Sequence, residues 1–395
     1  MESLDRYIVF MREHANDDLN RLLLSASRYP DVDIAFVVDQ ISSRRQIKDK
    51  LPSWYANDRL VFPSRISAEQ CSSEQTAIYK QRLVREDEHL CDLTGGLGID
   101  SYFFSRKVRK VTYIERFSEY CEAAKRNFSI IGADNVEVKN GDSVELINTI
   151  YNVDTFYIDP ARRGEGNRRV FALHDCEPDL IKLLPLLHQH AAKVIAKISP
   201  MADIRQTLEL MPSSTEVHVV SVRNECKELL FVMERGCEST VPNIHCVNFA
   251  SGDVEESFSF TIDEERDCGL SLAGGVGKYL YEPNASILKA GAFKVTASRW
   301  GLMKLHVSSH LYTGDMLIDG FPGRRFAVDE VIEFNNRSCK GLSKRIPRAN
   351  ITTRNFPISV DELRKRLKLA DGGDTYLFAT TLATGDRVLL CCHKI

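Results

Sequence analysis

The sequence lacks the features that would indicate a disulfide framework or a metal site. Its 11 cysteines are scattered, no Cys-x-x-Cys pair occurs, and the only close pair is the adjacent Cys391 and Cys392. The 10 histidines show no metal-ligand spacing either. We therefore expect reduced thiols in a cytoplasmic protein that holds no metal ion.

Targeting and anchoring segments are also missing from the sequence. Residues Met1 to Arg6 do not have the basic and then apolar pattern of a signal peptide. No apolar run is long enough to span a bilayer. We expect no membrane association.

Charge is nearly balanced over the 395 residues, with a net charge of −3, but it is unevenly distributed. The stretch from Arg337 to Lys368 holds ten lysines and arginines and only the acids Asp361 and Glu362. It also contains Phe356, an aromatic ring that could stack on a base. Such a stretch is typical either of a solvated face or of contact with an anionic polymer such as RNA.

The order of the predicted elements suggests more than one domain. Residues 1–70 show the amphipathic spacing of helices, and a further helix is expected from Ser73 to Arg85. From residue 89, short apolar runs alternate with helical segments, which predicts a parallel, doubly wound sheet closed by a hairpin. Its expected strands are 90–92, 111–115, 136–138, 155–159, 194–198, 216–222 and 228–233.

After Gly236 the alternation stops and an α+β region begins. A hairpin is expected at 247–250 and 257–262, helices at 285–291 and 361–369, and strands at 302–307, 326–334, 375–381 and 387–392. We therefore predict an N-terminal helical region (1–70), an α/β catalytic domain (71–236), a connecting α+β region (237–320) and a terminal domain (321–395).

A glycine-rich loop, Asp92-Leu93-Thr94-Gly95-Gly96-Leu97-Gly98-Ile99-Asp100, joins the first strand to a helix. Glycines allow the backbone to turn tightly and to approach a ligand, and the helix start offers free N–H groups. Dinucleotide sites use the same arrangement, but Asp92 and Asp100 would repel a pyrophosphate. The acidic flanks favour a ligand with a positive amino group and a sulfonium, which is S-adenosylmethionine.

Three more acids follow the next three strands, at Glu115, Asp142 and Asp159. Glu115 could accept hydrogen bonds from ribose hydroxyls, and Asp142 could accept from an adenine amine. Each acid alone has an ordinary explanation, such as an Asn-Gly turn at Asn140 and Gly141. Four acids at the carboxyl ends of four strands, however, would meet at the edge where open α/β sheets bind ligands.

With these motifs, residues 70–236 resemble class I methyltransferases, which have a mostly parallel seven-stranded Rossmann-like sheet. The resemblance implies that the glycine loop holds methionine, Glu115 the ribose and Asp142 the adenine. It assigns S-adenosylmethionine contacts to the residues Asp92, Thr94, Gly95, Gly96, Gly98, Asp100, Glu115 and Asp142.

Four longer sequence motifs make the family resemblance more specific. They are Asp159-Pro160-Ala161-Arg162-Arg163, Lys197-Ile198-Ser199-Pro200-Met201, Val222-Arg223-Asn224-Glu225-Cys226-Lys227-Glu228 and Tyr281-Glu282-Pro283-Asn284-Ala285. They resemble bacterial methyltransferases with ferredoxin-like and THUMP-like modules at the C-terminus. THUMP modules bind RNA, so the resemblance implies that RNA is a partner.

The phrase after the fourth strand bears on the acceptor. Amine methyltransferases of nucleobases use Asp or Asn, Pro, Pro and an aromatic, whereas this chain has Ala161 and Arg162. Asp-Pro-Pro-Arg occurs in RNA methyltransferases that act on base carbon, but those need a cysteine where this chain has Ser199-Pro200. Cys226 is expected in the turn of the terminal hairpin, where the alternatives are a catalytic thiol and a buried or bystander thiol, and we expect the latter. We assign Asp159, Pro160 and Arg162 to catalysis.

Basic residues are the candidates for substrate contact. Arg163 and Arg168 follow Asp159 closely, where the alternative is a solvated loop. In the C-terminal region the candidates are Lys344, Arg345, Arg348, Arg364, Lys365 and Arg366. The sequence thus predicts a methyltransferase acting on a nucleotide in RNA. The alternatives are a methyltransferase for a protein or small molecule and a non-catalytic RNA-binding protein that keeps the fold.

Overall fold

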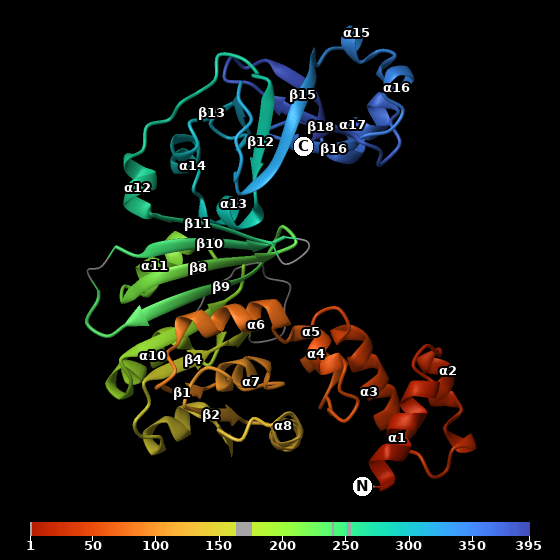
Figure 1. The fold of residues 1–395 in the computed structure, drawn as a ribbon, viewed down its shortest axis with the longest axis vertical. Helices are drawn as coiled ribbons and strands as arrows, with labels where there is room; N and C mark the ends of the chain where they lie inside the picture. The colour runs from red at the N-terminus through yellow and green to blue at the C-terminus, as the bar shows by residue number, and fades with distance from the viewer. Residues whose placement is uncertain (1, 163–175, 239–240, 251–253) are drawn as a thin grey trace. The chain divides into compact units, whose positions relative to one another are not determined.

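The computed structural model of the protein describes residues 2–162, 176–238, 241–250 and 254–395 (Figure 1). The chain divides into two compact units. The first comprises Met1–Thr215 and Leu229–Thr240, and the second comprises Glu216–Glu228 and Val241–Ile395. The boundary passes through the hairpin of β8 (Ser214–Val222) and β9 (Glu225–Glu234), so both units include part of this hairpin.

Helices form the beginning of the first unit, as the apolar spacing predicts. Asp18 and Asp33 accept backbone N–H groups at the starts of the second and third helices, which ends the preceding loops at those residues. Ile8, Leu22 and Val37 are buried in a core that these helices share. The helices are α1 (Glu2–Glu13), α2 (Leu19–Leu24), α3 (Ile34–Ile47), α4 (Pro52–Tyr55) and α5 (Arg65–Gln70).

The later part of this helical region packs on the α/β part of the same unit. Trp54 and Phe62 are each 1% exposed and share one apolar cluster with Phe103 of α7 (Ile99–Ser105). The amide of Asn127, in α8 (Ser118–Ile131), donates to the carbonyl of Val61 at 2.8 Å and accepts from its N–H at 2.9 Å. The two parts therefore have a common core.

The sheet of the first unit is mostly parallel, which confirms the predicted fold class. Its strands β1 (His89–Asp92), β2 (Lys110–Glu115), β3 (Val136–Asn140), β4 (Thr155–Ile158) and β7 (Lys193–Ile198) are parallel. The antiparallel strand β9 follows β7, and the order is β8-β9-β7-β4-β1-β2-β3. The chain reverses its direction of travel across the sheet between β1 and β4, and such a switch point is where open α/β sheets bind ligands.

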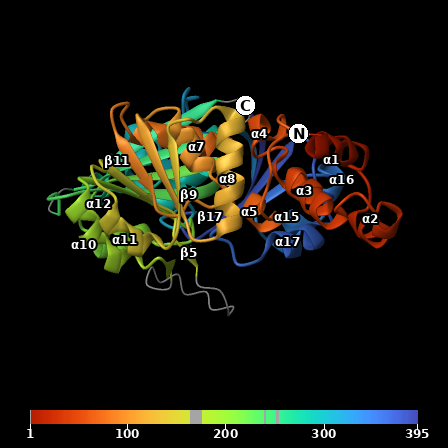
Figure 2. The same ribbon diagram turned by 90° about the horizontal axis from the view of Figure 1, so that it is seen from below.

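Helices cover both faces of this sheet. In Figure 2 the strands lie between α10 (Leu180–His190) and α11 (Ile204–Leu210) on one side and α7 and α8 on the other. The predicted helix from Ser73 is α6 (Glu74–Lys80), capped by the Ser73 hydroxyl as expected, but it ends at Lys80 and a 3-10 turn follows. The remaining elements are α9 (Ser143–Leu146), β5 (Ala161–Arg162) and β6 (Cys176–Glu177).

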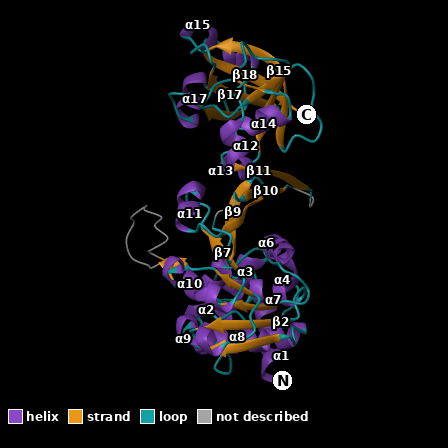
Figure 3. Ribbon diagram, turned by 90° about the vertical axis from the view of Figure 1, so that its left-hand side faces the viewer, coloured by secondary structure: helices purple, strands orange, loops and turns teal. Residues whose placement is uncertain are grey.

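In the second unit, β10 (Asn243–Phe249) pairs with β8 in parallel and with β11 (Glu255–Thr261) antiparallel. The hairpin predicted at 247–262 is thus confirmed. A separate sheet has the order β13-β14-β12-β15-β18-β17-β16. Figure 3 shows its strands β15, β17 and β18 beside the helix α17. Its strands are β12 (Tyr279–Pro283), β13 (Met303–Lys304), β14 (Tyr312–Gly314), β15 (Gly323–Glu333), β16 (Asn350–Arg354), β17 (Thr375–Thr381) and β18 (Arg387–Lys394). Its helices are α12 (Ile262–Asp267), α13 (Ala285–Ala290), α14 (Lys294–Arg299), α15 (Asn336–Cys339), α16 (Leu342–Arg345) and α17 (Val360–Leu367).

One predicted strand in this region is shorter than expected, and three strands were missed. The strand expected at 302–307 is only Met303–Lys304, and β12, β14 and β16 were not predicted. A charged residue in the middle of β12 concealed it, because Glu282 is 2% exposed yet inside a sheet. Its carboxylate is neutralised by Arg324 and by Arg354, the latter at 2.8 Å.

Two of the longer sequence motifs, 222–228 and 281–285, contact each other in the second unit. The side-chain oxygen of Asn224, in the turn between β8 and β9, accepts from the N–H of Ala285 at 2.7 Å. The Glu256 carboxylate accepts from the amides of both Asn248 and Asn284 at 2.9 Å, and Asn248 accepts from the N–H of Asn224. These bonds tie the start of α13 to β10 and to the turn after β8. Among the described residues, no helix is long and apolar enough to cross a membrane.

Candidate active site

A pocket of about 660 Å³ opens at the carboxyl ends of β1 to β4 in the first unit. The predicted cofactor residues Asp92, Thr94, Gly95, Gly96, Gly98, Asp100, Glu115 and Asp142 all line it, together with Asp159. The structure thus brings these residues together around one pocket. Their individual roles remain predictions.

The glycine loop is shaped by Tyr113 on β2. A Cβ atom added at Gly95 would lie 2.2 Å from Tyr113 Cε2, so no larger residue fits there. The Tyr113 hydroxyl donates to the carbonyl of Gly96 at 2.6 Å and fixes the loop from below. Gly98 precedes α7 with φ of 85°, a left-handed conformation that favours glycine. The glycine loop therefore packs closely against Tyr113 of β2, and it also lines the pocket.

Asp92 is buried at the end of β1, with 1% of its surface exposed. Its two oxygens accept from the backbone N–H of Thr94 at 3.1 Å and from the hydroxyl of Ser101 at 2.6 Å. Burial raises the pKa of Asp92 to about 7, although both hydrogen bonds oppose that shift. This carboxyl thus changes charge near neutral pH.

Glu115 and Asp142 are each oriented by backbone amides. The two oxygens of Glu115 accept from the N–H of Gly96 at 2.9 Å and of Phe117 at 3.0 Å, which couples the acid to the glycine loop. Asp142 caps α9 by accepting from the N–H of Val144 at 2.8 Å. Each oxygen that accepts one such bond can accept another from a ligand, because a carboxylate oxygen has two lone pairs.

Asp100 anchors a buried polar network beside the pocket. One of its oxygens lies 2.9 Å from Nζ of Lys80, a lysine whose side chain is fully buried. The other accepts from the hydroxyls of Ser72 at 2.8 Å and Tyr157 at 2.7 Å. Burial acts to raise the pKa of Asp100, but the charges of Lys80 and Lys197 outweigh it and the pKa is lowered. The network joins α6, α7 and β4.

Asp159 stands directly after β4 and is held from two directions. Its Oδ2 lies 2.5 Å from Nζ of Lys197 at the end of β7. Its backbone N–H donates to the hydroxyl of Thr94 at 2.7 Å. About a third of the Asp159 side chain is exposed, and it faces the pocket.

Several predicted residues do not line the pocket or lie outside the described chain. Pro160 follows Asp159 but does not line the pocket. Arg162 belongs to the strand β5, and its side chain is outside the described part of the protein. Arg163 and Arg168 lie outside the described residues. The basic candidates of the C-terminal region belong to the second unit: Lys344 and Arg345 in α16, Arg364, Lys365 and Arg366 in α17, and Arg348 between these helices.

Sequence reasoning missed part of the pocket wall. Ile66, Gln70 and Cys71, in and after α5, line the pocket beside the glycine loop. It also missed Lys80 and Lys197 as partners of the acids. Lys197 had a signal, because a lysine interrupts the apolar strand Lys193–Ile198 just before its end. Nothing in the sequence of α5 indicated that it would line the pocket beside the glycine loop.

The lining of the pocket is rich in acids. Among the described residues seven acids line it, and four of these form ion pairs: Asp100 with Lys80, Asp159 with Lys197, Glu177 with Arg116, and Asp179 with Lys182. The negative charge of the site therefore comes mainly from the other three, Asp92, Glu115 and Asp142. This charge suits a cationic ligand and opposes a pyrophosphate. Phe117 and Val144, which are 46% and 43% exposed, add apolar surface near Asp142. Apolar surface beside a hydrogen-bond acceptor suits a ligand group that is apolar with a polar edge.

Cys226 does not line this pocket. It lies at the start of β9, rather than in the turn where it was expected, since the strand begins at Glu225. Burial raises the pKa of its thiol to about 11, so the thiol is protonated at neutral pH. A thiolate is the nucleophilic form, and burial outweighs the help that the charge of Lys289 and the Ser221 hydroxyl give in forming it.

Comparison with a solved structure decides the family. A crystal structure of a candidate methyltransferase from Porphyromonas gingivalis W83 is 40% identical, and the match covers 100% of this chain and 98% of that chain with a TM-score of 0.89. The chain belongs to the S-adenosylmethionine-dependent methyltransferase family.

More distant relatives and family models agree with this assignment. An uncharacterized S-adenosylmethionine-dependent methyltransferase of Mycobacterium tuberculosis is 29% identical over 231 residues, 58% of this chain and 60% of that protein. An uncharacterized RNA methyltransferase of Streptococcus pneumoniae is 23% identical over 38% of this chain and 36% of that protein. A ferredoxin-like domain family matches residues 279–322 and a THUMP domain-like family matches 323–394. The match thus spans about 60% of the length of the M. tuberculosis relative.

Proposed function

We propose that this methyltransferase transfers a methyl group from S-adenosylmethionine to a nucleotide in RNA. The observation that carries the proposal is the pocket around the glycine loop, where Asp92, Glu115, Asp142 and Asp159 converge from the ends of four strands. S-adenosylmethionine supplies a methyl group on a positively charged sulfur, and an acidic pocket attracts that charge.

In this proposal each part of the cofactor has its own contacts. The loop residues Thr94, Gly95, Gly96 and Gly98, with Asp92, hold the methionine portion. Glu115 accepts from the ribose hydroxyls and Asp142 from the adenine amine. Asp100 acts through its network, because Lys80, Ser72 and Tyr157 already occupy its oxygens.

Asp159 is proposed to orient the acceptor atom of the substrate, with Pro160 and Arg162 beside it. Its two anchors, Thr94 and Lys197, hold it at the mouth of the glycine loop. Rigid placement of a group that contacts the acceptor lowers the barrier of the transfer step, because the reacting atoms meet in the productive geometry. Lys197 is a positioning residue in this scheme, since its contact is with Asp159.

The RNA substrate is supported by the THUMP-like match at 323–394 and by the basic residues within it. Lys344, Arg345, Arg348, Arg364, Lys365 and Arg366 are proposed to contact phosphates, as are Arg163 and Arg168 near Asp159. The catalytic domain would then be 71–236, after the helical region 1–70, and the regions 237–320 and 321–395 would position the RNA. The eleven free cysteines support a cytoplasmic enzyme.

The proposal is tested by incubating the full chain with cofactor labelled on the methyl group and with RNA from cells that lack the gene. We expect label in one modified nucleoside, and the same nucleoside should disappear from RNA when the gene is deleted. RNA from wild-type cells is the matched control, since its site is already methylated and should accept little label. Label in protein or in small molecules, with none in RNA, would favour the alternative substrates. Cofactor binding without any transfer would favour a non-catalytic RNA-binding protein.

A further inference from the structure

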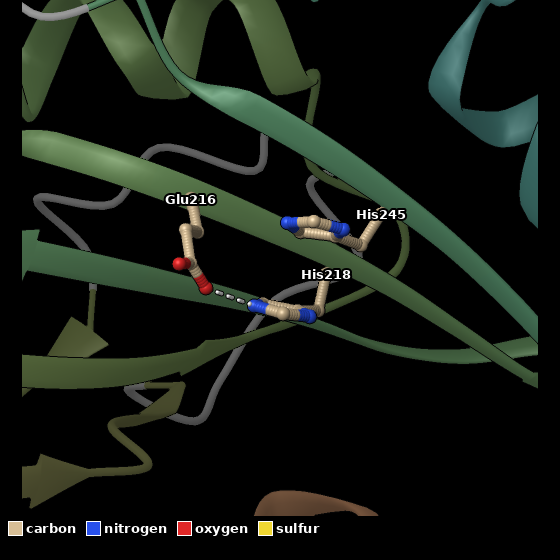
Figure 4. Close-up of side chains that lie close together, drawn as sticks. All are labelled: Glu216, His218 and His245. Carbon is tan, nitrogen blue, oxygen red and sulfur yellow. Dashed lines mark hydrogen bonds and ion pairs between the residues drawn. The ribbon is translucent and has the colours of Figure 1, made fainter. Parts of the chain in front are cut away.

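Two histidines and a glutamate form a cluster in the second unit, and none of them is among the residues assigned to methyl transfer (Figure 4). Glu216 and His218 are two residues apart on β8, so their side chains leave the same face of the strand. His245 on β10 is directly opposite His218 in the parallel pairing of the two strands. One ligand atom from each of the three residues lies within 4.8 Å of the other two.

The cluster is ordered by contacts among its own members. Nε2 of His218 lies 2.9 Å from a carboxylate oxygen of Glu216. The two imidazole rings are stacked, with centroids 4.7 Å apart and planes at 19°. His218 is 5% exposed, whereas His245 and Glu216 are partly exposed. The cluster is therefore buried at His218 and accessible to solvent at the other two residues.

His245 has the contact that a metal-binding histidine usually makes with its other nitrogen. Its Nδ1 lies 2.8 Å from the hydroxyl of Ser259 on β11. When Nδ1 donates its proton to that hydroxyl, Nε2 is the unprotonated nitrogen that can bind a metal. Metal-ligating histidines nearly always donate in this way to a second group, which fixes the ring and its tautomer.

We propose that Glu216, His218 and His245 bind a divalent transition-metal ion such as Zn²⁺. Imidazole nitrogens with a carboxylate oxygen are a ligand set that zinc, nickel, iron and copper accept. The ion would take the place of the proton shared by Glu216 and His218, and His245 would close toward it, because metal–ligand bonds are only about 2.0–2.2 Å long. Three protein ligands leave a further coordination position for water.

Such an ion would link β8 to β10. Metal binding would therefore stabilise the pairing of these two strands. The ion takes no part in the proposed methyl transfer. The expectation of no metal rested on spacing along the sequence, where His218 and His245 are far apart. Only the pairing of the two strands brings them together.

A matched control exists in the same unit. His393 Nδ1 lies 2.8 Å from Asp329, which gives a histidine–carboxylate pair with nearly the same distance, between β18 and β15. No second histidine belongs to a metal-type cluster with this pair among the described residues. If a histidine–carboxylate pair alone were enough to bind the ion, His393→Ala would lose a bound ion, whereas His245→Ala would lose none, because it leaves the Glu216–His218 pair intact.

The experiment is calorimetric titration of the untagged, chelator-treated full chain with ZnCl₂, under reducing conditions. We expect His245→Ala and Glu216→Gln to bind one equivalent fewer than the wild type, whereas His393→Ala keeps the wild-type number. Ser259→Ala should weaken binding at this site about 10- to 100-fold. Because eleven free cysteines could also bind zinc, Co²⁺ is a second probe: loss of the site should leave any thiolate–cobalt absorption unchanged.

His218 is buried, and its replacement could disturb folding, so the partly exposed His245 and Glu216 carry the test. Circular dichroism and thermal melting of the metal-free variants should match those of the metal-free wild type. Zn²⁺ should then raise the melting temperature of the wild type and of His393→Ala more than that of His245→Ala. Equal stoichiometry and affinity in the wild type, His245→Ala, Glu216→Gln and His393→Ala would overturn the proposal.

Discussion

The carboxylate of Asp159 and the ammonium of Lys197 form an ion pair, with Oδ2 and Nζ 2.5 Å apart. The two residues end neighbouring parallel strands, β4 and β7, so the pair lies at the edge of the sheet where the pocket opens. Thr94 holds the backbone of Asp159 from the opposite side through a 2.7 Å hydrogen bond. The direction of this one carboxylate is therefore fixed by the glycine loop and by β7 together.

Removing the charge of Lys197 should impair turnover more than cofactor binding. We expect Lys197→Met to lower kcat by up to about 100-fold, because a small misplacement of the orienting group has that effect. The Kd for S-adenosylmethionine should stay within a few-fold, and Lys197→Arg should recover part of kcat. Asp159→Ala should abolish turnover. Steady-state kinetics and calorimetry measure the two quantities.

Lys193 provides the control for that experiment, because it lies on the same strand and pairs with the buried Glu88 at 2.9 Å. Lys193→Met should lower the melting temperature and leave kcat near the wild-type value. If it lowers kcat as much as Lys197→Met does, the effect reflects the stability of β7 rather than the position of Asp159. Full activity of Asp159→Ala would place the transfer step elsewhere.

Glu115 should contribute directly to cofactor affinity. Replacement by glutamine preserves the size of the side chain but removes the negative charge that would strengthen its hydrogen bonds from the ribose hydroxyls. Loss of a hydrogen bond to a charged group costs about 1.5–3 kcal/mol. We expect Glu115→Gln to weaken S-adenosylmethionine binding about 10- to 100-fold in calorimetry. Glu119, exposed at the start of α8 and outside the pocket lining, is the control. Equal affinities in Glu115→Gln and Glu119→Gln would refute the ribose assignment.

Cofactor affinity should depend on pH through Asp92, whose pKa burial raises to about 7. A cationic ligand favours the ionised carboxyl, so affinity should rise as the pH increases toward 7 and should level off above it. The rise should be smaller in Asp92→Asn, which cannot ionise. Calorimetry of both proteins between pH 6 and pH 8 measures the difference, and parallel pH profiles would show that Asp92 does not meet the ligand's charge.

The same shift has a consequence for stability, with the opposite trend. Because the folded-state pKa of Asp92 is raised above the ordinary value of 3.8, its contribution to the free energy of unfolding is fully present below pH 3.8. That contribution is lost as the pH rises through about 7. Denaturant unfolding of the wild type should therefore lose stability relative to Asp92→Asn over this window. An unchanged difference across the window would contradict the assignment of the shift.

The four acids of the pocket could be predicted because each follows a strand, and parallel strands bring their carboxyl ends to one edge. Asp92 and Glu115 lie on adjacent strands, so a local pattern was enough to place them together. The contribution of α5 could not be predicted in this way. Ile66 and Cys71 reach the pocket because Trp54 and Phe62 pack against α7, and such packing is not encoded in spacing along the chain.

The polar partners of the acids were equally hidden. Lys80 reads as an ordinary basic residue near a helix end, yet its side chain is fully buried beside Asp100. Glu282 interrupts a strand that sequence patterns therefore missed, because two arginines from other strands neutralise it. His218 and His245 come together only through the parallel pairing of β8 with β10. Each of these contacts joins segments distant in sequence.

The loop conformation should be intolerant of a side chain at Gly95. A Cβ atom there would lie 2.2 Å from the Tyr113 ring, so Gly95→Ala must displace the ring or the loop. Overpacking of this kind typically costs about 1–3 kcal/mol. We expect Gly95→Ala to lower stability and to weaken cofactor binding at the same time, as measured by denaturant unfolding and calorimetry.

Gly132 is the matched glycine, because it has a positive φ of 70° but nothing within 4 Å of an added Cβ. Gly132→Ala should cost only the strain of its backbone conformation and should leave cofactor affinity unchanged. Equal losses of affinity at Gly95 and Gly132 would mean that general destabilisation, and not the shape of the loop, controls binding.

RNA affinity should depend on the basic residues of the THUMP-like part, and the structure separates them into two groups. Arg345 and Arg364 form ion pairs with Glu330 at 3.2 Å and Asp371 at 2.6 Å, so their charges are partly neutralised. Lys344 and Lys365 are exposed on α16 and α17.

Phosphate contacts release counterions, so each lost contact should reduce the salt slope by roughly 0.7–0.9 log units per log unit of salt. We therefore expect Lys344→Ala/Lys365→Ala to weaken RNA binding and flatten its salt dependence more than Arg345→Ala/Arg364→Ala. Binding isotherms over a salt series measure both quantities, with Arg6→Ala/Arg21→Ala in the N-terminal helices as a control of equal charge. Unchanged affinity and slope in the lysine variant would make these residues a solvated face, and failure of the wild type to bind RNA even at low salt would favour a protein or small-molecule substrate.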